Sequence, residues 1–301
     1  MTDTWNKNFS CSELSLKSNE ELFGTAPRVD VWFLLEYRGA WSDNTFVSSK
    51  ISENVKRRID ECLESIPNSR LQLIKRQNDS EGKLKFYLAK SDELDPKLFE
   101  FDLSDYEEIL DLDVDEMLSG ESNLRGRALF LICTNGAHDK CCGKYGVPVY
   151  LEAVKREDGF MIWQCTHLGG HRFAANVLFM PYGIYYGRVD LGSVSELIED
   201  AKNRHIRIEN YRGRCCYSRE VQAAEYFLRD NTGISDLNSI RFNGAKRSGS
   251  DISVEFHSVT DEIVYQIQVQ EDKDSLMTLT SCKDEEKSLV TQYRFVEFKR
   301  L

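Results

Sequence analysis

The stretch NVLFMPYGIYYGRV, residues 176–189, contains two apolar runs on either side of Pro181-Tyr182-Gly183. Proline and glycine in this arrangement favour a tight turn, so the stretch predicts a β-hairpin. A helix is expected over 193–203, where Ser193 and Glu196 form the pattern of a capping box. The sequence therefore predicts that this part of the chain ends with two strands and a helix.

The residues before the hairpin supply the rest of this unit. The runs 127–133 and 160–165 are apolar enough for buried strands, and 147–155 suits a helix with a proline in its first turn. The resulting order is β-α-β-β-β-α. It predicts an α/β fold in which helices flank a mixed sheet, as in thioredoxin-like proteins.

Two further regions flank this unit. Upstream, strand patterns at 29–37, 71–75 and 83–89 accompany a helical pattern at 51–66, in a β-α-β-β order. Downstream, a helical pattern is followed by alternating strands. No internal repeat is visible in the sequence.

These patterns divide the chain into three regions. Residues 1–120 form an N-terminal α/β region, itself a candidate for a second thioredoxin-like unit. Residues 121–212 form the thioredoxin-like unit described above, and residues 213–301 form a small C-terminal α+β region. The acidic stretch 102–121 has nine carboxylates and no lysine or arginine, so we expect a solvated face or a connector there.

The composition excludes several function classes. A net charge of −11 argues against broad binding of nucleic acid or anionic membranes, since both need a basic surface. No apolar run approaches the roughly 18 residues of a membrane span, and the first ten residues, MTDTWNKNFS, lack the apolar core of a signal peptide. We expect a cytoplasmic protein whose nine cysteines are reduced thiols, metal ligands or buried residues.

Cysteines and histidines gather after two of the predicted strands. CTNGAHDKCC, residues 133–142, follows the first of them, and HLGGH, residues 167–171, follows the second. Loops at one end of a sheet are common positions for functional sites. Together the two segments offer two thiolates and two imidazoles, while His138 is expected to be an exposed loop residue.

Three interpretations of this donor set stay open on the pattern alone. The spacing does not match a zinc finger, but an irregular structural zinc site would use the same donors. A [2Fe–2S] cluster fits because each iron needs its own pair of ligands; two histidines on one iron resemble a Rieske centre, although each Rieske loop carries one cysteine and one histidine. The third interpretation is a tight turn with two surface histidines. Gly169 and Gly170 would let the second loop fold closely around a metal.

The motifs of the chain resemble those of the sucrase/ferredoxin-like family. CSELS, GTAP, LLEYRGAW, CTNGAHDKCCGKYGVPV, HLGGHRFAANVL, YYGRV, YRGR and QAAEYFLR occur in that family's order. The segment 176–203 also looks like the closing hairpin and helix of thioredoxin-like [2Fe–2S] ferredoxins. In those proteins a C-x3-C motif supplies two ligands, and here His167 and His171 stand in its place.

The resemblance implies a thioredoxin-like ferredoxin domain over 121–212 with a bis-histidinyl [2Fe–2S] cluster as its cofactor. Two cysteines would bind one iron and two histidines the other. Carried over residue by residue, the implied ligands are Cys133, Cys142, His167 and His171, with Cys141 as the alternative to Cys142.

The expected function is one-electron transfer to and from redox partner proteins, with no nucleic acid or membrane partner. We find no general base, nucleophile or carboxylate pair for glycoside hydrolysis, so we expect an electron carrier rather than an enzyme. Two rivals stay open. One is a thiol–disulfide oxidoreductase that uses the adjacent cysteines Cys141 and Cys142, and the other is a structural zinc protein.

Overall fold

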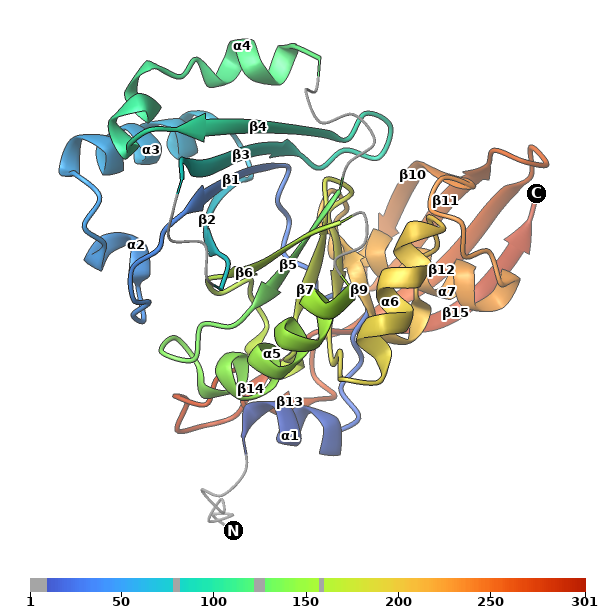
Figure 1. The fold of residues 1–301 in the computed structure, drawn as a ribbon. Coiled ribbons are helices and arrows are strands. Elements are labelled where there is room, and N and C mark those ends of the chain that lie inside the picture. The colour runs from blue at the N-terminus through green and yellow to red at the C-terminus, as the bar shows by residue number, and fades with distance from the viewer. Residues whose placement is uncertain (1–9, 78–81, 122–127, 157–159) are drawn as a thin grey trace.

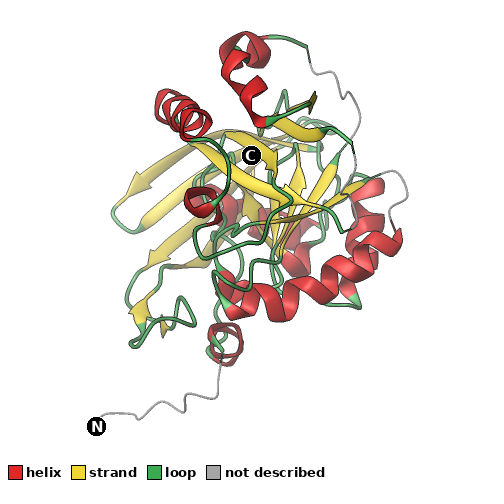
Figure 2. Cartoon of the chain, turned by 60° about the vertical axis from the view of Figure 1, so that its left-hand side comes forward, coloured by secondary structure: helices red, strands yellow, loops and turns green. Residues whose placement is uncertain are grey.

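The chain has a mixed α/β fold in a computed structural model that describes residues 10–77, 82–121, 128–156 and 160–301. The first nine residues, in which no signal peptide was expected, and the predicted strand residue Arg127 lie outside the described residues. The strands occupy the middle of the molecule, and most helices lie outside them (Figure 2). None of the described helices is long and apolar enough to cross a membrane.

The N-terminal half of the main sheet has four strands. β1 (Val31–Glu36) runs parallel to β2 (Ser69–Lys75) and antiparallel to β3 (Leu84–Lys90). β3 then pairs antiparallel with β4 (Lys97–Leu103). The crossover from β1 to β2 passes through α3 (Glu53–Ser65), whose apolar residues recur at helical spacing and are buried against the sheet.

The central half repeats this arrangement. β5 (Leu129–Cys133) runs parallel to β6 (Met161–Cys165) and antiparallel to β7 (Val177–Met180), which pairs with β8 (Ile184–Tyr186). The crossover from β5 to β6 passes through α5 (Lys140–Ala153). The hairpin predicted within 176–189 is therefore confirmed as β7 and β8.

The two halves join edge to edge in one nine-stranded sheet of order β4-β3-β1-β2-β6-β5-β7-β8-β9, in which β9 is Tyr211–Arg214. β2 and β6 pair antiparallel through Ile74 with Cys165 and Lys75 with Gln164. Outward from this junction, the first four strands of each half have the same order and directions, and β9 extends the central half by one strand. The predicted fold class, a mixed sheet flanked by helices, is confirmed.

The helices cover the outer faces of the two halves. α3 and α4 (Val114–Ser119) lie over the N-terminal half, and α5 and α6 (Ser193–Lys202) lie over the central half (Figure 1). The inner faces share a single apolar core, in which the rings of Trp32 and Tyr185 lie 6.2 Å apart. The sheet is therefore curled, so that the inner face of the N-terminal half packs against the inner face of the central half.

The C-terminal region is a second, antiparallel sheet with α7 (Arg219–Thr232) packed against it. A long excursion between its last two strands carries β13 (Met277–Thr278) and β14 (Ser288–Leu289) back to α1 (Cys11–Lys17), as Figure 1 shows. The strands of this sheet, in spatial order, are β10 (Ile240–Ser248), β11 (Asp251–Ser258), β12 (Val264–Asp272) and β15 (Gln292–Arg300).

Two details of the predicted helices are wrong. α5 begins at Lys140 rather than at 147, because the side chain of Asp139 caps it by accepting a hydrogen bond from the amide of Cys141 at 2.8 Å. Pro148 consequently lies inside the helix and not in its first turn. In α6 the N-cap is Gly192, and Ser193 instead donates its amide proton to Asp190 Oδ1 at 2.8 Å, so the predicted capping box is absent.

Candidate metal centre

The four predicted ligands lie where two neighbouring strands end. Cys133 is the last residue of β5, and His167 follows the end of β6. His171 opens the short helix η3 (His171–Phe173). Cys142 is in the first turn of α5 rather than on a loop, because the helix begins earlier than the sequence predicted. β5 and β6 are parallel neighbours, so both segments reach the same edge of the sheet.

The structure brings these side chains together in two overlapping groups. The sulfurs of Cys133 and Cys142 and a ring nitrogen of His167 lie within 4.8 Å of one another. Within this group, Cys142 Sγ is 3.7 Å from His167 Nδ1. The rings of His167 and His171 have their centroids 4.8 Å apart. A pair of thiols thus adjoins a pair of imidazoles, as the sequence spacing suggested.

The two thiols are buried, whereas the imidazoles reach the surface. Cys133 is 1% exposed and Cys142 is 0% exposed, but His167 and His171 are half-buried. The Cys142 thiol donates a hydrogen bond to Cys133, which lowers the pKa of Cys133 and raises that of Cys142. The lowered pKa of Cys133 favours its thiolate, the form of cysteine that binds metals.

His171 offers a buried ring nitrogen that could bind a metal. Its Nδ1 is buried and has no hydrogen-bond partner among the described residues. Burial lowers the pKa of His171, and the nearby Asp139 carboxylate only partly offsets that effect. The lowered pKa favours the neutral ring, the form of histidine that binds metals. A buried polar atom without a partner is costly, and a metal ion at this position would satisfy it.

The loop between the two histidines needs both of its glycines. Gly169 and Gly170 have φ angles of +99° and +72°, which side chains rarely adopt. A Cβ on Gly170 would lie 2.5 Å from Nη2 of Arg212. Arg212, from β9, is almost fully buried and donates hydrogen bonds to the carbonyl of Gly169 at 3.0 Å and to Oδ1 of Asn176 at 2.7 Å. Arg212 therefore fixes the shape of the loop.

The N-terminal half of the sheet holds the same loop from the other side. Arg70 in β2 donates hydrogen bonds to the carbonyls of His167 at 2.6 Å and Leu168 at 3.1 Å. Gln72, in the same strand, also donates to the His167 carbonyl at 3.1 Å. These positioning residues could not be recognised in the sequence, because they lie almost a hundred positions before the loop and β2 carries no motif.

A third imidazole belongs to the site. His138 was expected to be an exposed loop residue, but its ring stacks on His167 with a centroid distance of 4.1 Å and an angle of 22°. Nδ1 of His138 is 2.9 Å from a carboxylate oxygen of Asp43, which comes from the N-terminal half. Its position between Cys133 and Cys142 was the sequence signal that could have indicated this contact.

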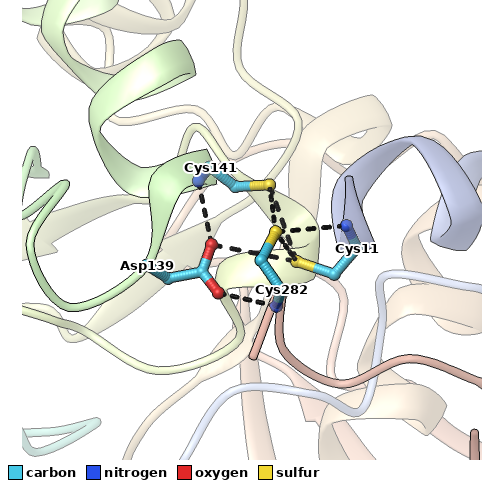
Figure 3. Close-up of side chains that lie close together, drawn as sticks. All are labelled: Cys11, Asp139, Cys141 and Cys282. Carbon is cyan, nitrogen blue, oxygen red and sulfur yellow. Dashed lines mark hydrogen bonds between the residues drawn. The ribbon is translucent and has the colours of Figure 1, made fainter. Parts of the chain in front are cut away.

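Cys141 points away from this site. Its sulfur is 3.3 Å from that of Cys282 and 3.6 Å from that of Cys11, in a separate cluster next to Asp139 (Figure 3). The structure thus places Cys142, and not Cys141, beside Cys133 and His167.

Comparisons with known proteins place the chain in a family. A model of the sucrase/ferredoxin-like family matches residues 22–213. Two relatives are each named "Altered inheritance of mitochondria protein 32". The one from Meyerozyma guilliermondii is 32% identical over 95 residues, which are 28% of this chain and 34% of the relative. The one from Debaryomyces hansenii is 30% identical over 99 residues, which are 29% of this chain and 36% of the relative.

Two solved structures share a limited similarity with the chain. The thioredoxin-like [2Fe–2S] ferredoxin from Aquifex aeolicus is 16% identical, with a TM-score of 0.26, over 28% of this chain and 89% of the ferredoxin. A cysteine-to-serine variant of the thioredoxin-like [2Fe–2S] ferredoxin from Aquifex aeolicus is 18% identical, with a TM-score of 0.22. That match covers 24% of this chain and 84% of the variant. The chain spans about a third of the length of the two curated relatives. The family model, in contrast, covers more than half of the chain, so this protein belongs to the sucrase/ferredoxin-like family.

Proposed function

We propose that the chain binds a [2Fe–2S] cluster through Cys133, Cys142, His167 and His171 and that it carries single electrons between redox partner proteins. The observation that carries the proposal is the meeting of two buried thiols with two half-buried imidazoles, one of which has an unpartnered ring nitrogen. A [2Fe–2S] cluster supplies one-electron chemistry, and its two irons each take a pair of protein ligands. Two sulfurs and two nitrogens match that requirement.

The burial of the four ligands suggests from which side of the molecule electrons would be exchanged with a partner. The thiols lie in the inner core of the sheet, whereas the three imidazoles are partly exposed. A pocket of about 440 Å³ opens beside His138 and His167 and is lined from the N-terminal half by Asp43, Phe46 and Arg70. A partner protein would therefore dock on the histidine side. A cytoplasmic location stays a prediction from the sequence.

The two rival functions are less well supported by the geometry. A disulfide between Cys141 and Cys142 would require both side chains to leave their present contacts, because their sulfurs lie in different clusters. A single zinc ion would satisfy Cys133, Cys142 and His167, but it would also have to draw in His171 or a water molecule to complete four ligands.

The test is a spectroscopic and chemical analysis of the full chain purified without oxygen. We expect equal amounts of iron and acid-labile sulfide, visible bands that bleach on reduction, and nitrogen couplings in the pulsed EPR spectrum of the reduced protein. His167→Ala and His171→Ala should each either reduce the nitrogen coupling to that of one imidazole or remove the cluster, whereas His205→Ala, at an exposed position, should change neither. A colourless protein that contains zinc would overturn the proposal, and so would a cluster without nitrogen coupling.

A further inference from the structure

A second group of thiols lies next to the proposed cluster site, and the function proposed above does not use it. Cys11 opens α1, Cys141 is the second residue of α5, and Cys282 lies between β13 and β14. Their three sulfurs form a triangle with sides of 3.3, 3.4 and 3.6 Å (Figure 3). Cys11 and Cys141 are fully buried and Cys282 is half-buried. Segments from the two ends of the chain thus meet on the central helix.

A buried carboxylate completes the group. Oδ1 of Asp139 lies 4.0 Å from the Cys11 sulfur and accepts a hydrogen bond from the amide of Cys141. Oδ2 accepts hydrogen bonds from the amide of Cys282 at 2.8 Å and the hydroxyl of Ser281 at 3.1 Å. A carboxylate has about four acceptor positions, and three of them are occupied by these donors. The fourth belongs to Oδ1, the oxygen that faces the sulfurs, and it receives the Cys11 thiol, whose proton a metal ion would displace.

The separation of the sulfurs selects one kind of occupant. In a disulfide two sulfurs lie about 2.05 Å apart and the third cysteine would be left over. Around a tetrahedral zinc ion with Zn–S bonds of about 2.3 Å, neighbouring sulfurs lie roughly 3.8 Å apart. The observed triangle is close to that spacing on all three sides, and a fourth donor is adjacent. We propose that Cys11, Cys141 and Cys282 bind one Zn²⁺ ion, with Asp139 as the fourth ligand.

The choice of zinc follows from the donors. Thiolates select soft or borderline ions, and a carboxylate oxygen beside them favours borderline Zn²⁺ over soft Cu⁺. Four protein donors without an open position are typical of structural zinc. The ion would displace the thiol protons, so its binding releases protons and strengthens as pH rises.

The surroundings explain why a structural ion would be useful here. The buried apolar cluster at this junction consists of Cys11, Cys141 and Ala174, with few apolar neighbours. α1 has only seven residues, and β13 and β14 have two each. Such short elements bury little apolar surface, so a metal ion would supply much of the free energy that fixes them to α5.

The test counts zinc and iron in the full chain after expression in zinc-containing medium and purification without oxygen. A Cys133→Ser/His167→Ala variant cannot hold the proposed [2Fe–2S] cluster but should retain one zinc ion per chain. Cys11→Ser and Cys282→Ser should lose that zinc and keep the iron of the other site. The matched control is Cys62→Ser, which removes a buried thiol of α3 and should change neither metal.

A second measurement does not depend on the folding of the Cys11→Ser and Cys282→Ser variants. Co²⁺ exchanged into the Cys133→Ser/His167→Ala variant should give the visible and charge-transfer bands of a tetrahedral thiolate site. Three results for this variant would overturn the zinc site. It could contain no zinc while all its thiols titrate as free, it could lack two free thiols because of a disulfide, or it could contain iron in place of zinc. Because iron is counted separately, absence of the [2Fe–2S] cluster in the wild-type protein would leave this result intact.

Discussion

The two halves of the nine-stranded sheet share the order of their first four strands, yet the proposed cluster ligands all come from the central half. There β5 ends in Cys133, and the loop after β6 holds His167 and His171. In the N-terminal half, the segments that follow β1 and β2, residues 37–52 and 76–83, contain neither cysteine nor histidine. The same scaffold therefore accompanies a cysteine–histidine group in the central half and, among the described residues, no such group in the N-terminal half. The chemistry depends on the residues at the strand ends and not on the fold.

The N-terminal half contributes support instead of ligands. The C-terminal ends of β2 and β6 meet at the junction, so strand-end residues of both halves face each other there. Arg70 and Gln72 hold the histidine loop, and the Ser42 carbonyl accepts a hydrogen bond from Asn135 at 3.0 Å. We propose that the region up to about residue 120 is a second thioredoxin-like unit whose role is to position the loops of the first.

The largest expected effect tests which of the two adjacent cysteines of the central half binds iron. Cys142→Ser should abolish iron binding. The Cys142 sulfur adjoins His167, and without it the iron that needs two thiolate ligands has only Cys133. Cys141→Ser should retain the iron and the visible spectrum, because its sulfur belongs to the other cluster. Iron content and absorbance of the two variants, purified in parallel, decide between them. The reverse outcome would reassign the ligand to Cys141.

The second prediction concerns the reduction potential. A neutral imidazole replaces a negatively charged thiolate at each histidine ligand, so the cluster is less negative and is easier to reduce. Rieske centres lie at roughly −150 to +300 mV, against about −400 mV for plant-type ferredoxins. His167→Cys/His171→Cys, if it assembles a cluster, should shift the potential measured by redox titration toward the lower value. A wild-type potential already near that value would contradict histidine ligation.

The sequence predicts the strands of the central half well, but it does not predict how that half joins the N-terminal half. Apolar runs and the Pro181-Tyr182-Gly183 turn are local signals, and they correctly indicated β5 to β8. The junction of β2 with β6 rests on only two residue pairs, which leave no local pattern. The repeated strand order is equally hidden, because VWFLLE in β1 and LFLIC in β5 share apolar character but no sequence repeat.

The same distinction applies to the candidate site. Spacing within 133–142 and 167–171 made the central donors recognisable, since each segment is short. The start of α5 was missed because Gly143 and Gly146 weaken its helical pattern. Gly146 is needed where the helix touches β5, since a Cβ there would lie 1.9 Å from the Cys133 carbonyl oxygen. The contact of Cys11 with Cys282 spans 271 positions and has no sequence signal.

A smaller effect is expected from the support given by the N-terminal half. Arg70→Met removes two charge-assisted hydrogen bonds to the histidine loop. Such bonds contribute about 1.5–3 kcal/mol when buried; because Arg70 is partly exposed, we expect a roughly ten-fold faster loss of iron to a chelator. Arg57→Met is the control, since it removes an exposed arginine of α3 from the same half. Equal rates in both variants would mean that the N-terminal half does not position the loop.

The smallest effect concerns Asp43, which links the N-terminal half to the C-terminal excursion. Hydrogen bonding to Lys283 at 2.8 Å, with a further contribution from His138, holds the pKa of Asp43 below its usual range. A carboxylate whose pKa is lower in the folded than in the unfolded chain stabilises the fold above its unfolded pKa. That contribution is lost as pH falls through the lowered pKa.

Asp43→Asn should therefore reduce the free energy of unfolding slightly at neutral pH, and the difference from the wild type should vanish in acid, where Asp43 is protonated in both states. Urea unfolding over a pH series measures this difference. Lys283→Met should reproduce the loss, and the double variant should add little to either change, because both substitutions break the same ion pair. A difference that persists undiminished in acid would show that Asp43 acts through packing or neutral hydrogen bonds. Its charge would then play no part in joining the N-terminal half to the segment that carries Cys282.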